Sequence, residues 1–77
     1  MAEIVLPELG EGIKKATVAY WHCGPGKKVG PEDDLVEVVT DKATFNIPSG
    51  TEGVITKIFA GVGDEVSVGA LLAEIQP

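Results

Sequence analysis

The stretch that decides the fold lies in the middle of the chain and reads Leu35-Val36-Glu37-Val38-Val39-Thr40-Asp41-Lys42-Ala43-Thr44-Phe45-Asn46-Ile47-Pro48. Val36 and Val38 share one face opposite Glu37, and the run after the turn alternates in the same way, as is typical of half-buried β-strands. Only Asp41 and Lys42 separate the two runs, so we expect a tight hairpin that projects Lys42 from its tip. Asp41 suits such a turn because its side chain can bond nearby backbone N–H groups.

Outward from this hairpin, ten glycines and five prolines interrupt short β-prone runs. Such punctuation is typical of an all-β sandwich or barrel, and no run predicts an amphipathic helix of useful length. In the run at 53–59, apolar residues fall on both faces, which predicts that both sides of that strand are partly covered. We expect eight strands, at residues 3–7, 16–22, 27–30, 34–40, 43–48, 53–59, 64–67 and 71–76.

The two halves of the chain resemble each other, with a constant offset over most of their length. The matched residues agree in type and in expected burial, so they indicate a structural repeat. At an offset of 37, the pairs are Gly24 with Gly61, Gly26 with Gly63, Val29 with Val66, Leu35 with Leu72, Glu37 with Glu74, Val18 with Ile55 and Trp21 with Ile58. Nearer the start the offset is 41, and the pairs are Leu6-Pro7 with Ile47-Pro48 and Glu11-Gly12 with Glu52-Gly53.

The repeat predicts the architecture. We expect a single domain, residues 1–77, made of half-repeats at about 4–40 and 43–76. It should fold as a flattened barrel or sandwich of two four-stranded antiparallel sheets with internal two-fold quasi-symmetry. Neither half alone could bury enough apolar area, so each must complete the other's core. The chain passes from one half-repeat to the other near Lys42. The two offsets map this position onto the first and last residues, so the termini should lie together at the end of the domain opposite Lys42.

The change of offset from 41 to 37 gives the first half four extra residues within 12–16. An insertion in a core strand would destroy its register, so we expect the excess in a loop at residues 8–15. The counterpart of this loop is the short turn at residues 49–52. The loop is either a drifted surface segment or an enlarged recognition loop.

Composition excludes several classes of function. The net charge is −6, from twelve acidic residues against six lysines and no arginine. A nucleic-acid binder shows a basic patch, and anionic lipid repels an acidic surface, so we expect neither partner. Cys23 is the single cysteine, so we expect no internal disulfide and no zinc site, and His22 should point to the opposite face. We therefore predict no metal and no catalytic residue, and we interpret Trp21 as a core residue.

The segment Glu37-Val38-Val39-Thr40-Asp41-Lys42-Ala43 resembles the attachment motif of lipoyl domains from 2-oxo-acid dehydrogenase complexes. The opening Leu6-Pro7-Glu8-Leu9-Gly10-Glu11-Gly12 and the closing Gly63-Asp64-Glu65-Val66-Ser67-Val68-Gly69 are similar to the same family, so the resemblance covers essentially the whole chain. It implies a flattened barrel of two four-stranded sheets, with lipoate amide-linked to Lys42 between the turn flanks Asp41 and Ala43. The chain departs from the family pattern at Val39, often glutamate, and at Gly26-Lys27, often Gly-Asp.

The resemblance also implies a function. A lipoate-attaching enzyme modifies Lys42, and a thiamine-diphosphate-dependent 2-oxo-acid decarboxylase then reductively acylates the lipoyl group. An acyltransferase core passes the acyl group to coenzyme A, and dihydrolipoamide dehydrogenase, a flavoprotein, reoxidises the dithiol. The domain is then a non-catalytic swinging arm of a dihydrolipoamide acyltransferase subunit, and monomeric in isolation. Because lipoate is identical on every carrier, partner choice should come from the surface beside the arm, for which we nominate Glu8, Leu9, Gly10, Glu11 and Gly12.

Two other functions stay open at this point. Biotinyl domains share the fold but usually flank the modified lysine with methionines, whereas Asp41 and Ala43 flank Lys42 here. The second alternative is a β-sandwich interaction module whose turn lysine is unmodified. The acidic opening predicts no signal peptide, so we expect a bacterial cytoplasm or, in a eukaryote, the mitochondrial matrix. Pyruvate, 2-oxoglutarate and branched-chain 2-oxo acids are equally compatible with the sequence.

Overall fold

Eight strands make up the computed structural model, which describes residues 2–77. They are β1 (Ala2–Val5), β2 (Lys15–Trp21), β3 (Lys28–Val29), β4 (Asp34–Val39), β5 (Thr44–Pro48), β6 (Gly53–Ile58), β7 (Glu65–Ser67) and β8 (Leu71–Gln76). All eight expected strands are present, with ends within two residues of those predicted. Met1, the first residue of the expected domain 1–77, lies outside the described residues. No helix among residues 2–77 is long and apolar enough to span a membrane.

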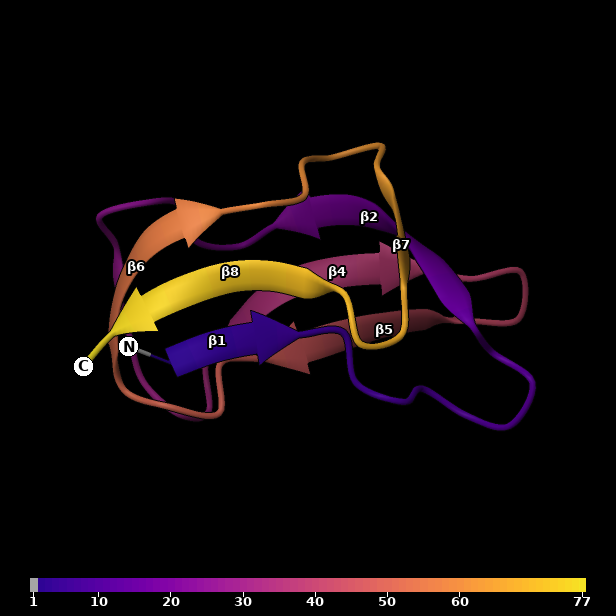
Figure 1. Cartoon of the computed structure of the whole chain (residues 1–77), viewed down its shortest axis with the longest axis horizontal. Coiled ribbons are helices and arrows are strands. Elements are labelled where there is room, and N and C mark those ends of the chain that lie inside the picture. The colour runs from indigo at the N-terminus through magenta and orange to yellow at the C-terminus, as the bar shows by residue number, and fades with distance from the viewer. Residues whose placement is uncertain (1) are drawn as a thin grey trace.

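The strands form two four-stranded antiparallel sheets that pack face to face (Figure 1). Sheet A has the order β1-β8-β6-β3, and sheet B has the order β5-β4-β2-β7. No strand of one sheet pairs with a strand of the other, so the expected sandwich is confirmed but is not closed into a barrel. β3, from the first half, pairs with β6, and β7, from the second half, pairs with β2. Each sheet therefore contains strands of both halves.

The offset of 37 also relates the two β-bulges at which the strand pairing shifts its register in β2 and β6. The β2–β4 pairing skips Ala19, and the β6–β8 pairing skips Thr56, 37 positions later. A bulge of this kind shifts the alternation of the residues that follow it. Ile55 before the bulge is buried, Ile58 after it is half-buried, and Val54 is exposed. The bulge, rather than a covering layer on both sides, accounts for the mixed pattern expected from the sequence of β6.

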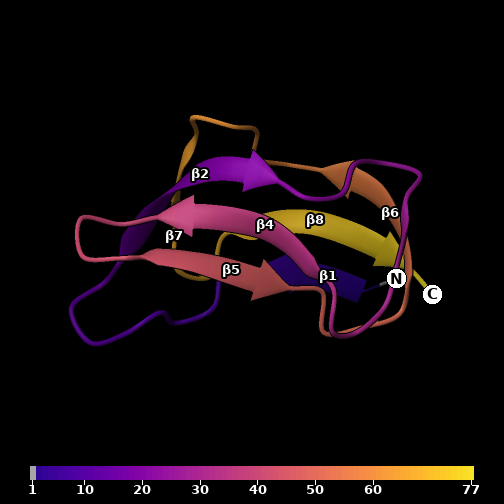
Figure 2. The ribbon, with the colours of Figure 1, turned by 180° about the vertical axis from the view of Figure 1, so that it is seen from behind.

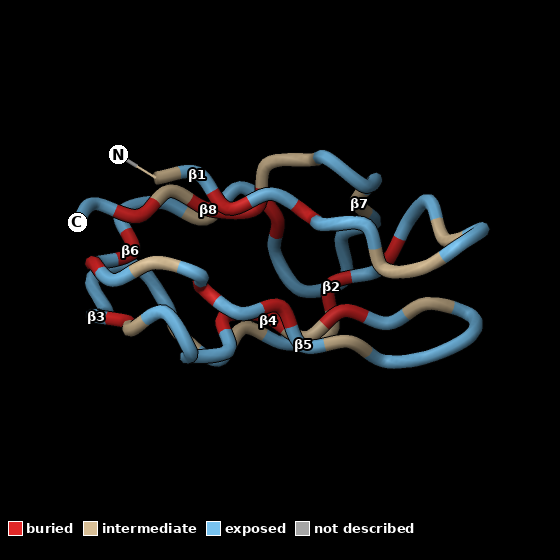
Figure 3. Tube along the Cα trace, turned by 90° about the horizontal axis from the view of Figure 1, so that it is seen from below, coloured by how far each residue is buried: buried red, intermediate tan, exposed pale blue. Residues whose placement is uncertain are grey.

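The inward-facing residues of both sheets make one apolar core (Figure 3). Leu35 and Leu72, which the repeat pairs, are both fully buried. Burial of one such side chain contributes about 1.5–3 kcal/mol. Trp21 packs half-buried against this core, and its indole Nε1 donates to the backbone carbonyl of Ala60 at 2.7 Å. Trp21 is thus part of the packing, as the sequence indicates.

The β4–β5 hairpin and the described ends of the chain lie at opposite ends of the sandwich (Figures 1 and 2). β1 and β8 are neighbours, with Ala2 opposite Ile75, so the two described ends of the chain lie side by side. The expected separation of the turn at residues 40–43 from the termini is therefore confirmed.

Gly53 begins β6 where this strand lies between β3 and β8. A Cβ built at this position would collide with the backbone carbonyl of Gln76 and would lie 2.7 Å from Cγ2 of Ile75. A glycine in a strand often marks such a close approach of another backbone. Because Gly53 has no side chain, the backbones of β6 and β8 can approach each other closely at this position.

Gly53→Ala should lower the free energy of unfolding by about 1–3 kcal/mol, because the added methyl group forces β8 away from β6. Gly24→Ala is the control, since a Cβ on Gly24 would meet no atom within 4 Å. It should change stability by less than about 0.5 kcal/mol. Urea unfolding followed by Trp21 fluorescence measures both variants, and equal midpoints would contradict the close approach described at Gly53.

Candidate functional site

Residues 40–43 form the turn at the tip of the β4–β5 hairpin. The last ladder pair is Val39 with Thr44, and beyond it the Thr40 N–H donates to the Ala43 carbonyl at 2.8 Å. Lys42 is exposed at this tip. Within residues 2–77, the structure shows no hydrogen bond or ion pair of its Nζ. The amine is therefore accessible to a second protein.

The hydroxyl group of Thr40 holds this turn together. Its Oγ1 accepts hydrogen bonds from the backbone N–H of Ala43 at 3.0 Å and of Lys42 at 3.2 Å, and it donates to the Ala43 carbonyl at 2.9 Å. The expectation that Asp41 bonds these N–H groups is wrong, because Thr40 does so and Asp41 is exposed. Both residue types make side-chain turns of this kind, so the sequence Thr-Asp does not reveal which one acts.

The β1–β2 loop, residues 6–14, lies at the same end of the sandwich as the turn (Figure 1). A Cβ built on Gly12 would lie 3.7 Å from Nζ of Lys42, so the loop reaches the amine at this residue. Gly12 has a φ of 82°, a conformation that favours glycine. The counterpart is the short β5–β6 turn, residues 49–52, at the other end. The extra length of the first half therefore lies in a loop beside the turn lysine.

The residues nominated for partner recognition differ in exposure. Glu8 and Glu11 are exposed, whereas Leu9 and Gly10 are half-buried. Leu9 packs against the core, and the Ile13 N–H donates to the Gly10 carbonyl at 3.1 Å. The apolar side chain and the local turn anchor the loop, while the carboxylates of Glu8 and Glu11 remain on its surface.

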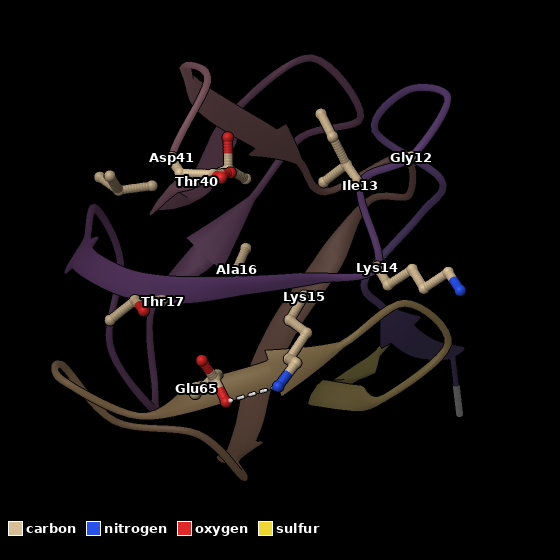
Figure 4. A pocket seen from close by; sticks show the side chains of 10 residues that line it. Gly12, Ile13, Lys14, Lys15, Ala16, Thr17, Thr40, Asp41 and Glu65 are labelled. Carbon is tan, nitrogen blue, oxygen red and sulfur yellow. Dashed lines mark hydrogen bonds and ion pairs between the residues drawn. The ribbon is translucent and has the colours of Figure 1, made fainter.

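A shallow groove of about 380 Å³ opens between this loop and the hairpin (Figure 4). Its walls come from residues 12–17, from residues 39–41 and from Glu65 of β7. Lys15 Nζ lies 3.5 Å from the Glu65 carboxylate, an exposed ion pair worth about 0–1 kcal/mol. Lys14 points away from this pair (Figure 4). Because the walls are distant in sequence, no local pattern predicts the groove.

His22 and Cys23, which follow β2, have partners of their own. His22 Nε2 and Asn46 Oδ1 are hydrogen-bonded at 2.9 Å, and the ring of His22 meets the ring of Tyr20 edge-on at 5.1 Å. Cys23 is half-buried, with Sγ 4.0 Å from the Asp34 carbonyl. Among the residues that the structure describes, no three His, Cys, Asp or Glu side chains are grouped so as to hold a metal ion.

Comparison with known proteins gives the family. The family model Biotin_lipoyl, described as "Biotin-requiring enzyme", matches residues 2–75. The chain is 42% identical over 74 residues to the dihydrolipoyllysine-residue succinyltransferase component of the 2-oxoglutarate dehydrogenase complex of Bartonella vinsonii subsp. berkhoffii. It is 34% identical over 74 residues to the lipoamide acyltransferase component of the branched-chain alpha-keto acid dehydrogenase complex of Bacillus subtilis (strain 168). Each alignment covers 96% of this chain but 18% of the relative, so the chain spans less than a fifth of these proteins.

A solved structure has the same fold over its whole length. The solution structure of the lipoyl domain of the 2-oxoglutarate dehydrogenase complex from Azotobacter vinelandii is 34% identical to this chain, with a TM-score of 0.79. The superposition covers 100% of this chain and 98% of that domain. The chain therefore belongs to the biotin/lipoyl domain family and, within it, to the lipoyl domains.

Proposed function

We propose that lipoate is joined by an amide bond to Nζ of Lys42, and that this arm moves acyl groups within a 2-oxo-acid dehydrogenase complex. The observation that carries the proposal is the exposed hairpin tip, where the lysine amine makes no hydrogen bond or ion pair with the described residues. Lys14, Lys27 and Lys28 are exposed as well, so Lys42 differs from them by its place at the tip of a hairpin. Two further lysines have a neighbouring side chain. Lys15 is paired with Glu65, and Nζ of Lys57 lies 5.1 Å from the centroid of the Phe59 ring.

The turn suits a covalently attached acyl group. Amide formation removes the positive charge of Lys42, and no carboxylate among the described residues loses an ion-pair partner by it. The paired strands β4 and β5 fix the base of the arm, while the side chain beyond the turn is free to move. Once attached, the dithiolane supplies the redox and acyl-transfer chemistry that protein side chains lack. The residues of this chain then have to present the arm, not to catalyse.

We propose further that the domain is a non-catalytic part of an acyltransferase subunit like those of its relatives. A chain that continues beyond residues 2 or 77 would leave from the end opposite Lys42, so a linker would not obstruct the arm. A flexible linker of suitable length holds a tethered group at an effective concentration of roughly mM. The placement of the ends thus supports the role of a mobile carrier.

The proposed partners are a lipoate-attaching enzyme, a 2-oxo-acid decarboxylase, an acyltransferase core and dihydrolipoamide dehydrogenase. The β1–β2 loop is the surface that we propose for partner recognition, because Gly12 lies beside the amine and Glu8 and Glu11 are exposed. Exposed charges of this kind change encounter rates and partner choice more than affinity.

The biotin-carrier alternative has less support. The family model covers both kinds of domain, but both relatives and the solved structure described above are lipoyl proteins. The flanks of Lys42 are Asp41 and Ala43, not methionines. Lipoate is therefore the cofactor that we propose.

Lys42→Ala should abolish modification when the chain is produced with lipoate and a lipoate-attaching enzyme. The variant should stay within about 0.5 kcal/mol of wild-type stability, because Lys42 is an exposed residue. Lys27→Ala, which removes another exposed lysine, is the control and should gain the lipoyl mass normally. Intact-mass spectrometry and urea unfolding measure the two effects.

The other outcomes of this experiment separate the alternatives. A biotin increment on the wild-type chain would favour a carboxylase carrier. An unmodified wild-type chain, beside normal modification of an established lipoyl domain, would favour an interaction module. A Lys42→Ala variant that does not fold would contradict the exposed position of this residue.

Glu8→Gln combined with Glu11→Gln should slow reductive acylation by the native decarboxylase while leaving lipoylation unchanged. Two exposed charges at about 0–1 kcal/mol each predict a decrease in kcat/KM of at most about thirtyfold at low salt, and added salt should reduce the difference. Glu52→Gln, in the counterpart turn at the other end, is the control. Equal acylation rates for all variants at low salt would remove the loop carboxylates from partner recognition.

A further inference from the structure

The turn at residues 40–43 is closed by one side chain rather than by its backbone alone. In a two-residue hairpin, the residues that flank the turn commonly exchange two backbone hydrogen bonds. Here Thr40 N–H donates to the Ala43 carbonyl at 2.8 Å, but the Ala43 N–H donates to Oγ1 of Thr40 at 3.0 Å. The side-chain oxygen stands in for a backbone acceptor.

The same hydroxyl group also fixes the backbone of Lys42. The Lys42 N–H donates to Oγ1 at 3.2 Å, and the hydroxyl hydrogen is donated to the Ala43 carbonyl at 2.9 Å. A threonine hydroxyl has one donor and two acceptor sites, so these three bonds use its full capacity. Thr40 is half-buried, whereas Asp41 and Lys42 are exposed. One oxygen atom of Thr40 therefore binds two backbone N–H groups at the base of the lysine arm, beside the backbone bond from Thr40 to Ala43.

We propose that Thr40 is the positioning residue for the modification of Lys42: its hydroxyl holds the turn in the shape that presents the amine to the lipoate-attaching enzyme. The proposal rests on the proposed function above. Without the hydroxyl, the N–H groups of Lys42 and Ala43 lose their acceptor within the protein and donate to water instead. The turn then populates other shapes, and the population that the enzyme can bind decreases.

The attachment step itself shows why position matters. The deprotonated amine of Lys42 attacks the carbonyl carbon of a lipoyl adenylate, which is formed from lipoate and ATP. A C–N bond forms, the C–O bond to the phosphate breaks, AMP leaves with the bonding pair, and the amine proton passes to solvent. A fixed base places the nucleophile in line with this carbon, and orientation of this kind is a large part of rate acceleration.

The test compares Thr40→Val, which removes the hydroxyl at nearly constant volume, with Thr40→Ser, which keeps it. Thr44→Val is the matched control, because Thr44 is exposed and its hydroxyl makes no hydrogen bond within residues 2–77. Each 77-residue chain is treated with lipoate, ATP and a lipoate-attaching enzyme, and the modified fraction is followed by intact mass. We expect kcat/KM to decrease about tenfold in Thr40→Val and to stay within about twofold of wild type in Thr40→Ser and Thr44→Val.

Hydrogen exchange provides a readout that is independent of the enzyme. The backbone amides of Lys42 and Ala43 should exchange faster in Thr40→Val, with exchange of the core amides of β4 and β8 unchanged. Normal lipoylation of Thr40→Val, or equal defects in Thr40→Val and Thr40→Ser, would overturn the proposal. If Thr40→Val does not fold, Thr40→Ala replaces it under the same criteria. A wild-type chain that gains no lipoyl mass would instead overturn the proposed function itself.

Discussion

The pairing of β3 with β6 and of β7 with β2 is the constraint on which the rest of the structure depends. Each half contributes two strands to each sheet, so neither sheet is complete without both halves. This mixed pairing makes one core from the two half-repeats. It also places the β4–β5 turn, which connects the halves, at the opposite end of the sandwich from the described ends of the chain (Figure 2). The accessible lysine and the chain ends are far apart for this reason.

Most of the fold could be predicted from the sequence because alternation and the repeat give the same answer. The bulges at Ala19 and Thr56 could not, since an extra residue in a strand leaves no mark in composition. A departure from the repeat did indicate a local difference. Asp64 accepts a hydrogen bond from the Gly61 N–H at 2.8 Å, whereas Lys27, at the matching position, has no acceptor in its side chain.

The site was predictable in its position but not in its construction. The turn at residues 40–43 follows from two strands with two residues between them, and the loop at residues 6–14 follows from the change in offset. The bonds of Thr40 Oγ1 do not follow, because Asp41 is an equally suitable turn residue by type. The approach of Gly12 to Lys42 depends on how the β1–β2 loop packs against a hairpin that is distant in sequence. A pattern of alternating residues carries no information about such a contact.

The close approach of the two described ends has a topological consequence. Ala2 lies opposite Ile75, in the place that the two-fold relation assigns to the turn at residues 40–43. A short peptide joining the ends would create a second hairpin, and the connectivity would become a closed ring of eight strands. Circular permutation, with new ends opened inside residues 40–43, would keep every strand pairing while exchanging the roles of the two hairpins. The two half-repeats are thus joined at one end of the sandwich by the turn that carries Lys42, and at the equivalent end the described ends of the chain lie side by side.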